Sequence, residues 1–120
     1  MKCILVVDDD DAVREAIAET LEYGGYSVES AADGLQALAK VKAALPDAIV
    51  LDLMMPVMDG WAFLERCRKE DLCSDTPILL TSAVRQLEET ARELRVQACL
   101  SKPFDLDELL LVVGRLLSHA

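Results

Sequence analysis

The 120 residues include 22 acidic and 12 basic side chains, so the formal net charge at pH 7 is −10. A charge of this sign argues against unaided binding to nucleic acid or to an anionic membrane surface, and it favours proteins or cations as partners. Apolar residues make up 52% of the chain and aromatic residues only 4%, which predicts one domain with an aliphatic core that needs no disulfide or metal to hold it together.

Four cysteines lie in segments that have strand or helix patterns, and no two of them show C-x-x-C spacing: Cys3, Cys67, Cys73 and Cys99. We interpret them as structural thiols in a reducing compartment rather than as zinc ligands or disulfide partners. The chain enters a strand by residue 3 and shows neither a charged leader nor a long apolar span. We therefore expect a cytoplasmic protein without a secretory or transmembrane segment.

Strand and helix patterns alternate five times along the chain, which predicts the (βα)5 order of a doubly wound sheet. Residues 3–7 form the first strand, which is uniformly apolar. Asp11 is placed to cap the helix that follows, and Gly24 and Gly25 are placed to end it. Residues 26–31 form a weaker, more alternating strand, as expected near the edge of a sheet.

The second helix is predicted to follow Asp33 and Gly34 and to stop before Pro46. Proline ends the helix because it disfavours the helical conformation in the residue before it. Four aliphatic side chains of this helix are expected to face the core: Leu35, Leu38, Val41 and Leu45.

The second half of the chain repeats the pattern. Strands are predicted over residues 48–51, 78–81 and 98–101. Uniformly apolar strands of this kind are buried on both faces, which indicates a parallel sheet covered by helices. The helices between and after these strands are predicted from about Trp61 to Lys69, around Leu87 to Leu94, and from Asp105 onward.

Charged side chains follow three of the predicted strands at the point where each strand ends. Asp8 and Asp9 follow the first strand, Asp52 follows the third, and Lys102 with Pro103 follows the fifth. The carboxyl ends of the strands form the active edge of such a sheet, so three carboxylates and one ammonium are predicted to meet there. Carboxylates that repel one another call for a hard divalent cation such as Mg²⁺, and the combination suits phosphoryl chemistry on an aspartate.

Two motifs extend this pattern: L-D-L-M-M-P-V-M-D-G over residues 51–60, and S-K-P-F around the lysine. Together with Asp8, Asp9 and Ser82, in this order and at nearly the family's spacing, they resemble the response-regulator receiver family, the CheY-like phosphoacceptor domains. The resemblance covers essentially the whole chain. It implies a flavodoxin-like α/β fold with a five-stranded parallel sheet of order 2-1-3-4-5, in a receiver domain over residues 1–120 without an output domain.

The resemblance also implies a role for each residue of the site. Asp52 would accept a phosphoryl group from a histidine kinase or a histidine phosphotransfer protein. Lys102, which this family typically joins to the following proline by a cis bond, and Ser82 would contact phosphoryl oxygens. Four groups would serve a Mg²⁺ site: the carboxylates of Asp9 and Asp52, the backbone carbonyl of Met54, and Asp8, which orients a water on the metal.

A protein of this family is a regulator rather than an enzyme with outside substrates. It catalyses only its own phosphorylation and dephosphorylation, and it signals by changing which proteins it binds. The surface formed by the fourth helix, the fifth strand and the last helix is the usual dimer surface of the family, so a homodimer is one possible partner arrangement.

The chain departs from the family pattern in the segment that follows the fourth strand. The family usually carries an aromatic residue or histidine three positions before the lysine, and its ring swings inward on activation; here that position is Cys99, so the ring switch is absent. The stretch between Ser82 and Lys102 is slightly shorter than usual, and we expect a reduced or displaced fourth helix. Met54 and Val84 border the path of the attacking water in this family, and because both are apolar we expect slow loss of the phosphoryl group.

Other interpretations stay open at the level of the sequence. An aspartate at a strand end is often only a helix cap, and Thr81 could replace Ser82 as the hydroxyl donor. The chain could instead be a receiver-fold interaction module that works without phosphate. Cys99, in place of the usual ring, is the residue that supports this alternative. A hydrolase of the haloacid-dehalogenase type fits worst, because it needs an acidic or amide residue in place of Met54. We assign no catalytic role to His119 near the C-terminus.

Overall fold

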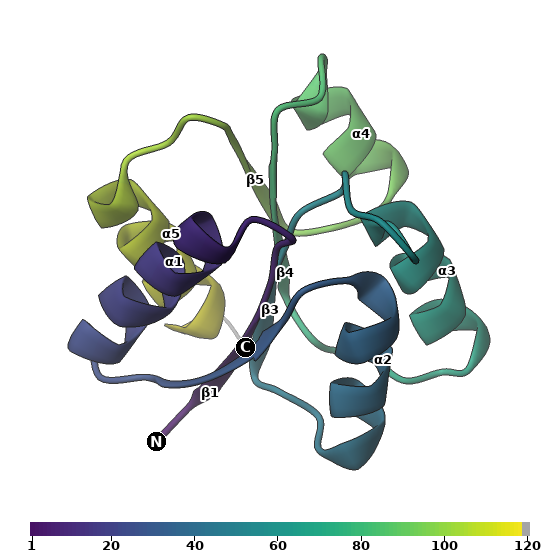
Figure 1. The fold of residues 1–120 in the computed structure, drawn as a ribbon, viewed down its shortest axis with the longest axis horizontal. Helices are drawn as coiled ribbons and strands as arrows, with labels where there is room; N and C mark the ends of the chain where they lie inside the picture. Colours follow the sequence, from purple (N-terminus) through teal and green to yellow (C-terminus); the bar gives the residue numbers. More distant parts are fainter. Residues whose placement is uncertain (119–120) are drawn as a thin grey trace.

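The computed structural model describes residues 1–118, so His119 lies outside the described residues. Strands and helices alternate along this part of the chain, as predicted (Figure 1). The strands are β1 (Cys3–Val7), β2 (Ser27–Ala31), β3 (Ala48–Leu51), β4 (Ile78–Ser82) and β5 (Ala98–Ser101). The helices are α1 (Asp11–Tyr23), α2 (Gly34–Ala43), α3 (Gly60–Lys69), α4 (Leu87–Glu93) and α5 (Leu106–Ser118).

The strands form one parallel sheet in the order β2-β1-β3-β4-β5, which confirms the predicted doubly wound fold. Every residue of β3 and β4 is buried, because helices cover both faces of the sheet. In Figure 1, α1 and α5 lie together on one side of the sheet, and α2, α3 and α4 lie on the other. The edge strands β2 and β5 are only partly buried, in agreement with the weaker apolar pattern predicted for the second strand.

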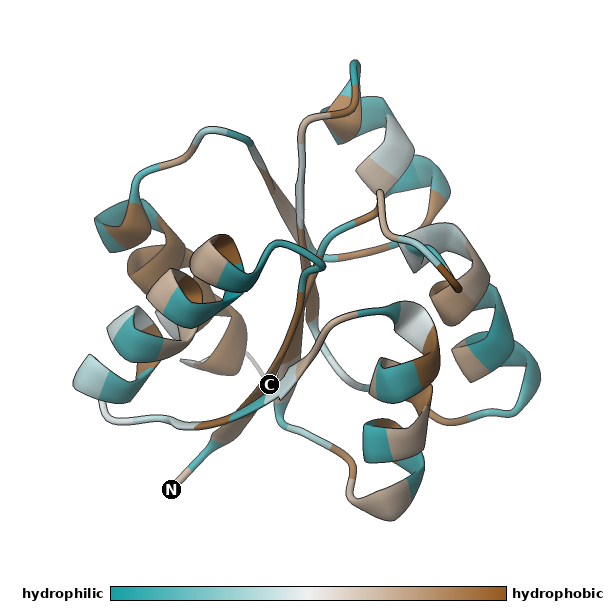
Figure 2. Ribbon diagram, in the orientation of Figure 1, coloured by the Kyte–Doolittle hydropathy of each residue, from teal (hydrophilic) through white to brown (hydrophobic). Residues whose placement is uncertain are grey.

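Alternating side chains of the strands divide the interior into two apolar clusters. Leu5 and Val7 belong to the cluster on the side of α2, α3 and α4, whereas Ile4 and Val6 belong to the cluster on the side of α1 and α5. Figure 2 shows the hydrophobic residues concentrated on the strands and on the inward sides of the helices. Within residues 1–118, Phe63 is the only ring among the largest fully buried side chains, so the core is aliphatic, as the composition predicts.

The prediction that Asp11 caps the first helix is wrong by one residue. Asp10 is the N-cap: its carboxylate accepts hydrogen bonds from the amides of Ala12 and Val13 at 2.9 and 3.1 Å. The backbone at Asp10 is extended, which is the conformation an N-cap residue requires, and Asp11 is already the first helical residue.

The prediction for the inward face of α2 is also partly wrong. Leu38 and Val41 are buried, but Leu35 is 52% exposed and Leu45 is 56% exposed. The phase of the helix is set at its first residue, because Gly34 packs so closely on Met58 that an added Cβ would lie 2.6 Å from the carbonyl oxygen. The buried positions are therefore 34, 37, 38 and 41, and Leu45 lies beyond the end of the helix.

The segment between β4 and β5 contains a short helix. Helix α4 has only seven residues, and Gln86 before it adopts a left-handed conformation without a side-chain cap. This agrees with the expectation of a reduced fourth helix. No helix within residues 1–118 combines the length and the apolar character that a bilayer crossing needs.

Candidate functional site

The site begins where β1 and β3 end side by side. These strands pair in parallel register, with Val7 opposite Leu51, so the next residues, Asp8 and Asp52, emerge at the same edge. The Asp52 amide donates a hydrogen bond to the Val7 carbonyl at 2.9 Å, which extends the pairing to the first residue of the loop. The strand order places β1 between β2 and β3, so this edge is the topological switch point at which open α/β sheets bind ligands.

Three carboxylates converge at this edge. One carboxylate oxygen from each of Asp8, Asp9 and Asp52 lies within 4.8 Å of the other two. Asp8 and Asp52 are 1% and 4% exposed, whereas Asp9 lies in the exposed part of the turn before α1. The structure therefore brings together the acidic residues that the sequence placed at two different strand ends.

Lys102 supplies a positive charge to the same place. Its Nζ donates to Asp8 Oδ2 at 2.7 Å and to Asp52 Oδ2 at 3.2 Å, and its side chain is 22% exposed. Its amide donates to the Ser82 carbonyl at 2.9 Å, which fixes the start of the loop after β5 to the end of β4. The peptide bond from Lys102 to Pro103 is cis, as the family resemblance implied.

Burial shapes the electrostatics of this cluster. Desolvation raises the pKa of Asp52 above its ordinary value; the Lys102 ammonium opposes the increase, and the Asp8 carboxylate adds to it. Burial lowers the pKa of Lys102, but its hydrogen bond to Asp8 and the charge of Asp52 outweigh burial, so that pKa is raised overall. One ammonium thus offsets the burial of Asp52 only in part, and a further cation would be stabilised here.

The donor set fits Mg²⁺, which prefers oxygen ligands from one or two carboxylates together with several waters. Asp8 and Asp52 each have one oxygen paired with Lys102, and each accepts a backbone hydrogen bond as well, from Asp10 at 2.9 Å and from Met54 at 3.3 Å. Within residues 1–118, no hydrogen bond or ion pair engages the Asp9 carboxylate, which leaves it available to a cation.

The loop from β3 to α3 is held close to the site by Gly60. Its amide donates to the Leu53 carbonyl at 2.9 Å, and a Cβ at this position would lie 2.6 Å from the Asp52 carbonyl oxygen. Asp59 then caps α3 by accepting from the Ala62 amide at 2.9 Å. These contacts fix the backbone on both sides of the exposed Met54 side chain, whose carbonyl the sequence analysis placed among the metal ligands.

Ser82 ends β4 and is fully buried. Its hydroxyl oxygen accepts a long hydrogen bond from the Val84 amide, at 3.5 Å. Thr81 is also fully buried, and its hydroxyl is without a hydrogen-bond partner in the described part of the chain. Successive residues of a strand point to opposite faces, so the two hydroxyls occupy different environments.

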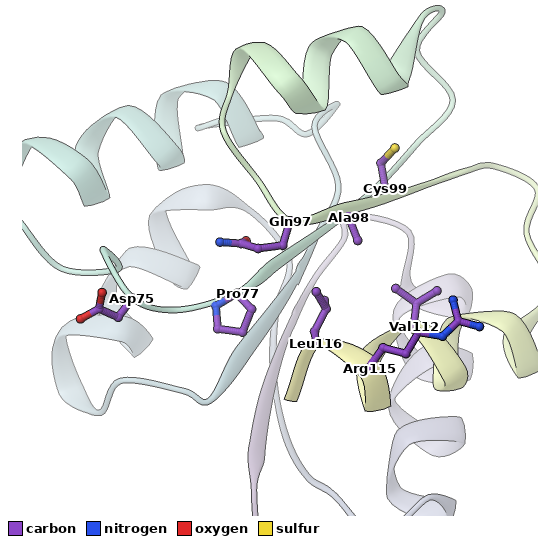
Figure 3. A pocket seen from close by; sticks show the side chains of 8 residues that line it. All are labelled: Asp75, Pro77, Gln97, Ala98, Cys99, Val112, Arg115 and Leu116. Carbon is purple, nitrogen blue, oxygen red and sulfur yellow. The ribbon is translucent and has the colours of Figure 1, made fainter. Parts of the chain in front are cut away.

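Cys99 lies on β5 opposite Leu80 of β4 and packs partly buried against the cluster on the α4 side. Burial raises the pKa of its thiol, and the Glu88 carboxylate adds to the increase. Figure 3 shows Cys99 and Ala98 pointing away from each other. Both residues line a hollow of about 550 Å³ whose other walls include residues of α5. Neither Asp52 nor Lys102 lines this hollow, which lies apart from the acidic cluster.

One residue of the site escaped the sequence analysis. Arg14, on the first turn of α1, donates from Nη1 to the Asp8 carbonyl at 2.7 Å and from Nη2 to Asp11 Oδ1 at 2.5 Å. The only signal in the sequence is an arginine three residues after Asp11, which is the spacing of an ordinary helical ion pair. The contact with Asp8 depends on the path of the turn and was not visible in that spacing.

Known proteins resemble this chain along nearly its whole length. The family profile described as the response regulator receiver domain matches residues 4–114. The chain is 48% identical over 110 residues to the response regulator MprA of Mycobacterium avium, covering 89% of this chain and 47% of that protein. It is 37% identical over 119 residues to the DNA-binding dual master transcriptional regulator RpaA of Synechocystis, covering 98% of this chain and 49% of that protein.

Among solved structures, the chemotaxis protein CheY4 of Vibrio cholerae matches with a TM-score of 0.87 and 36% identity, covering 97% of this chain and 98% of that one. The chain spans about half the length of the two curated relatives, so the activities of those whole proteins do not pass to it by similarity alone. Apart from Cys3, the first residue of β1, the matching span nevertheless contains the strands of the sheet, and it contains each residue of the acidic cluster. The chain belongs to the response regulator receiver domain family.

Proposed function

We propose that this chain is the phosphoacceptor of a two-component phosphorelay, in which Asp52 accepts a phosphoryl group with Mg²⁺ from a histidine kinase or a histidine phosphotransfer protein. The observation that carries the proposal is the convergence of Asp8, Asp9 and Asp52 within 4.8 Å, with the Lys102 ammonium 2.7 and 3.2 Å from two of them. Such partners act in the cytoplasm, which is where we expect the protein to work.

Asp52 is the nucleophile in this proposal because it matches the phosphoacceptor position of the receiver family; it is 4% exposed and has two neighbouring carboxylates. One of its oxygens forms the new bond to phosphorus while the bond from phosphorus to the donor nitrogen breaks, and the electron pair stays on that nitrogen. Phosphoryl transfer asks little of the protein besides positioning and charge. The backbone hydrogen bond from Met54 to Oδ1 helps hold the Asp52 carboxylate in place.

Charge neutralisation is divided between the chain and the metal. When bound, Mg²⁺ would stabilise negative charge on the phosphoryl oxygens, held by Asp9, Asp52 and the Met54 carbonyl, with Asp8 orienting a water. Lys102 would bring its ammonium to a phosphoryl oxygen. It would keep its hydrogen bond to Asp8, at 2.7 Å, and exchange its longer contact with Asp52 for one with that oxygen. Ser82 donates its hydroxyl to a third oxygen once the phosphoryl group is present.

We further propose that the output is a change in protein binding that starts at the loop after β4. The Ser82 hydroxyl has only a 3.5 Å contact to give up, so it can turn toward a phosphoryl oxygen at little cost. Movement of residues 82–86 would then alter the face formed by α4, β5 and α5, where a target protein or a second copy of the chain could bind. Cys99 is too small to repeat the inward swing of a ring.

Intact-mass measurement with Mg²⁺ and acetyl phosphate tests the proposal. The wild-type chain is expected to gain one phosphoryl group, and chelation of Mg²⁺ is expected to prevent the gain. Asp52→Asn keeps the size of the side chain but removes the nucleophile, so it is expected to show no gain. An undiminished gain in Asp52→Asn would refute the assignment of the acceptor, and a wild type that gains nothing would favour a module that works without phosphate.

A further inference from the structure

The turn between β1 and α1 carries Asp8 and Asp9, and its two acidic side chains are held in different ways. The Asp8 carboxylate accepts from the Asp10 amide at 2.9 Å and from Lys102 at 2.7 Å. By contrast, the Asp9 carboxylate has no partner in residues 1–118. The position of Asp9 therefore depends on how its backbone is held.

Arg14 is the side chain that holds this backbone. Its Nη1 donates at 2.7 Å to the carbonyl of Asp8, which belongs to the peptide unit joining Asp8 to Asp9. The side chain is only 19% exposed, and the bond is charge-assisted, so it is among the stronger hydrogen bonds available to a turn. On the other side of Asp9, the Asp10 carboxylate fixes the chain to the start of α1 by capping it.

The second bond of Arg14 orients its guanidinium. Nη2 donates to Asp11 Oδ1 at 2.5 Å, but the Asp11 side chain is 87% exposed. An exposed ion pair at this spacing contributes little by itself. The partly buried bond to the Asp8 carbonyl is therefore the contact that matters for the turn, and Asp11 has a supporting role.

We propose that Arg14 is a positioning residue of the metal site: by holding the peptide unit between Asp8 and Asp9, it presents the Asp9 carboxylate to Mg²⁺. This inference rests on the proposed function, because it needs a cation to bind the acidic cluster. Partners of metal ligands commonly affect affinity without touching the metal, since they limit the orientations that a ligand can adopt. Here the partner acts through the backbone of the ligand rather than through its side chain.

The test is a titration of the full chain with MgCl₂, without a phosphodonor, followed by the backbone amide shifts of residues 8–10 and 52–54. Arg14→Ala is expected to raise the Kd for Mg²⁺ about tenfold, the lower end of the usual range for an outer partner of a ligand. Arg14→Lys keeps one donor for the Asp8 carbonyl and is expected to recover part of the loss. Asp11→Asn leaves that bond in place and is expected to stay close to wild type.

Arg66→Gln is the matched control, because Arg66 also pairs with a nearby carboxylate, that of the C-cap residue Glu70 at 3.0 Å, but touches no metal-binding segment. It is expected to bind Mg²⁺ like wild type. A lower melting temperature of Arg14→Ala with an unchanged Kd would overturn the inference and show that Arg14 serves the stability of α1 alone. If Arg14→Ala does not fold, the other two variants decide. The inference would be overturned if Arg14→Lys bound Mg²⁺ with the Kd of the wild type while Asp11→Asn bound it more weakly. A wild type that binds no Mg²⁺ would overturn the proposed function together with the inference.

Discussion

The acidic site at the ends of β1 and β3 and the segment between β4 and β5 are built very differently. At the edge where β1 and β3 end, Asp8 and Asp52 are almost fully buried and are linked through one ammonium. Between β4 and β5, helix α4 has seven residues, Gln86 is left-handed, and Cys99 is only partly buried on an edge strand. The groups that we propose for phosphoryl acceptance thus lie together, whereas the segment that we propose for readout departs from the family pattern. In the proposed function, acceptance and readout therefore depend on different segments of the chain.

Removal of the ammonium is expected to have the largest effect on acceptance. Lys102→Ala is predicted to slow phosphorylation by acetyl phosphate roughly a hundredfold at saturating Mg²⁺, because the ammonium stabilises charge that develops on the phosphoryl oxygens. The rate of the mass increase measures this. Lys40→Ala is the control, since Lys40 forms only an exposed ion pair with Glu29. Equal rates for Lys102→Ala and wild type would show that Lys102 has no part in transfer.

A smaller effect is expected on the lifetime of the phosphoryl group. Met54 is 60% exposed and Val84 is partly buried, and neither can orient a water by hydrogen bonding. The double substitution Met54→Asn with Val84→Glu is predicted to speed hydrolysis about tenfold, because positioning one water is worth about 1.4 kcal/mol of barrier. Decay of the phosphorylated forms, followed by intact mass, measures it. Equal or slower decay in the double variant would contradict the account of slow hydrolysis.

The smallest predicted effect concerns the unphosphorylated protein. Mg²⁺ relieves repulsion that exists only when the strand ends are assembled, so free Mg²⁺ at several times its Kd is predicted to stabilise the fold by about 1 kcal/mol. This corresponds to a rise of a few degrees in the midpoint of a thermal melt. Asp9→Ala loses the carboxylate that is free for the metal, and it is predicted to lose most of that rise. The same midpoint shift in both proteins would place the cation elsewhere.

Much of the fold and the acidic cluster could be predicted because both follow from the ends of apolar strands. Buried strands that alternate with helices favour a parallel sheet between two helical layers, and the parallel sheet brings Asp8 and Asp52 to one edge whatever the details of the helices. Lys102 joins them for the same reason. These predictions needed only the positions of the strand ends along the chain, whereas the strand order 2-1-3-4-5 was implied by the family resemblance.

The errors lie where packing chooses between neighbouring options. Four consecutive aspartates run from the end of β1 into the first residue of α1, and the conformation of the turn, rather than residue type, makes Asp10 the cap. The exposed Leu35 could not be foreseen, because the close contact of Gly34 with Met58 sets the phase of α2. Arg14 was missed because its bond to the Asp8 carbonyl exists only once the turn has formed. Each case depends on the conformation of a turn or on a packing contact, and sequence periodicity encodes neither.

The central claim is that Asp52 accepts the phosphoryl group and that the response is carried by the loop after β4. Amide spectra of the wild type with Mg²⁺, recorded with and without beryllofluoride as a phosphoryl mimic, test it most directly. The account predicts changes around Asp52 and in residues 82–86, the latter lost in Ser82→Ala and all of them lost in Asp52→Asn. The same spectral changes in Asp52→Asn would contradict the acceptor assignment, and changes in 82–86 that survive Ser82→Ala would contradict the assigned switch and point to Thr81.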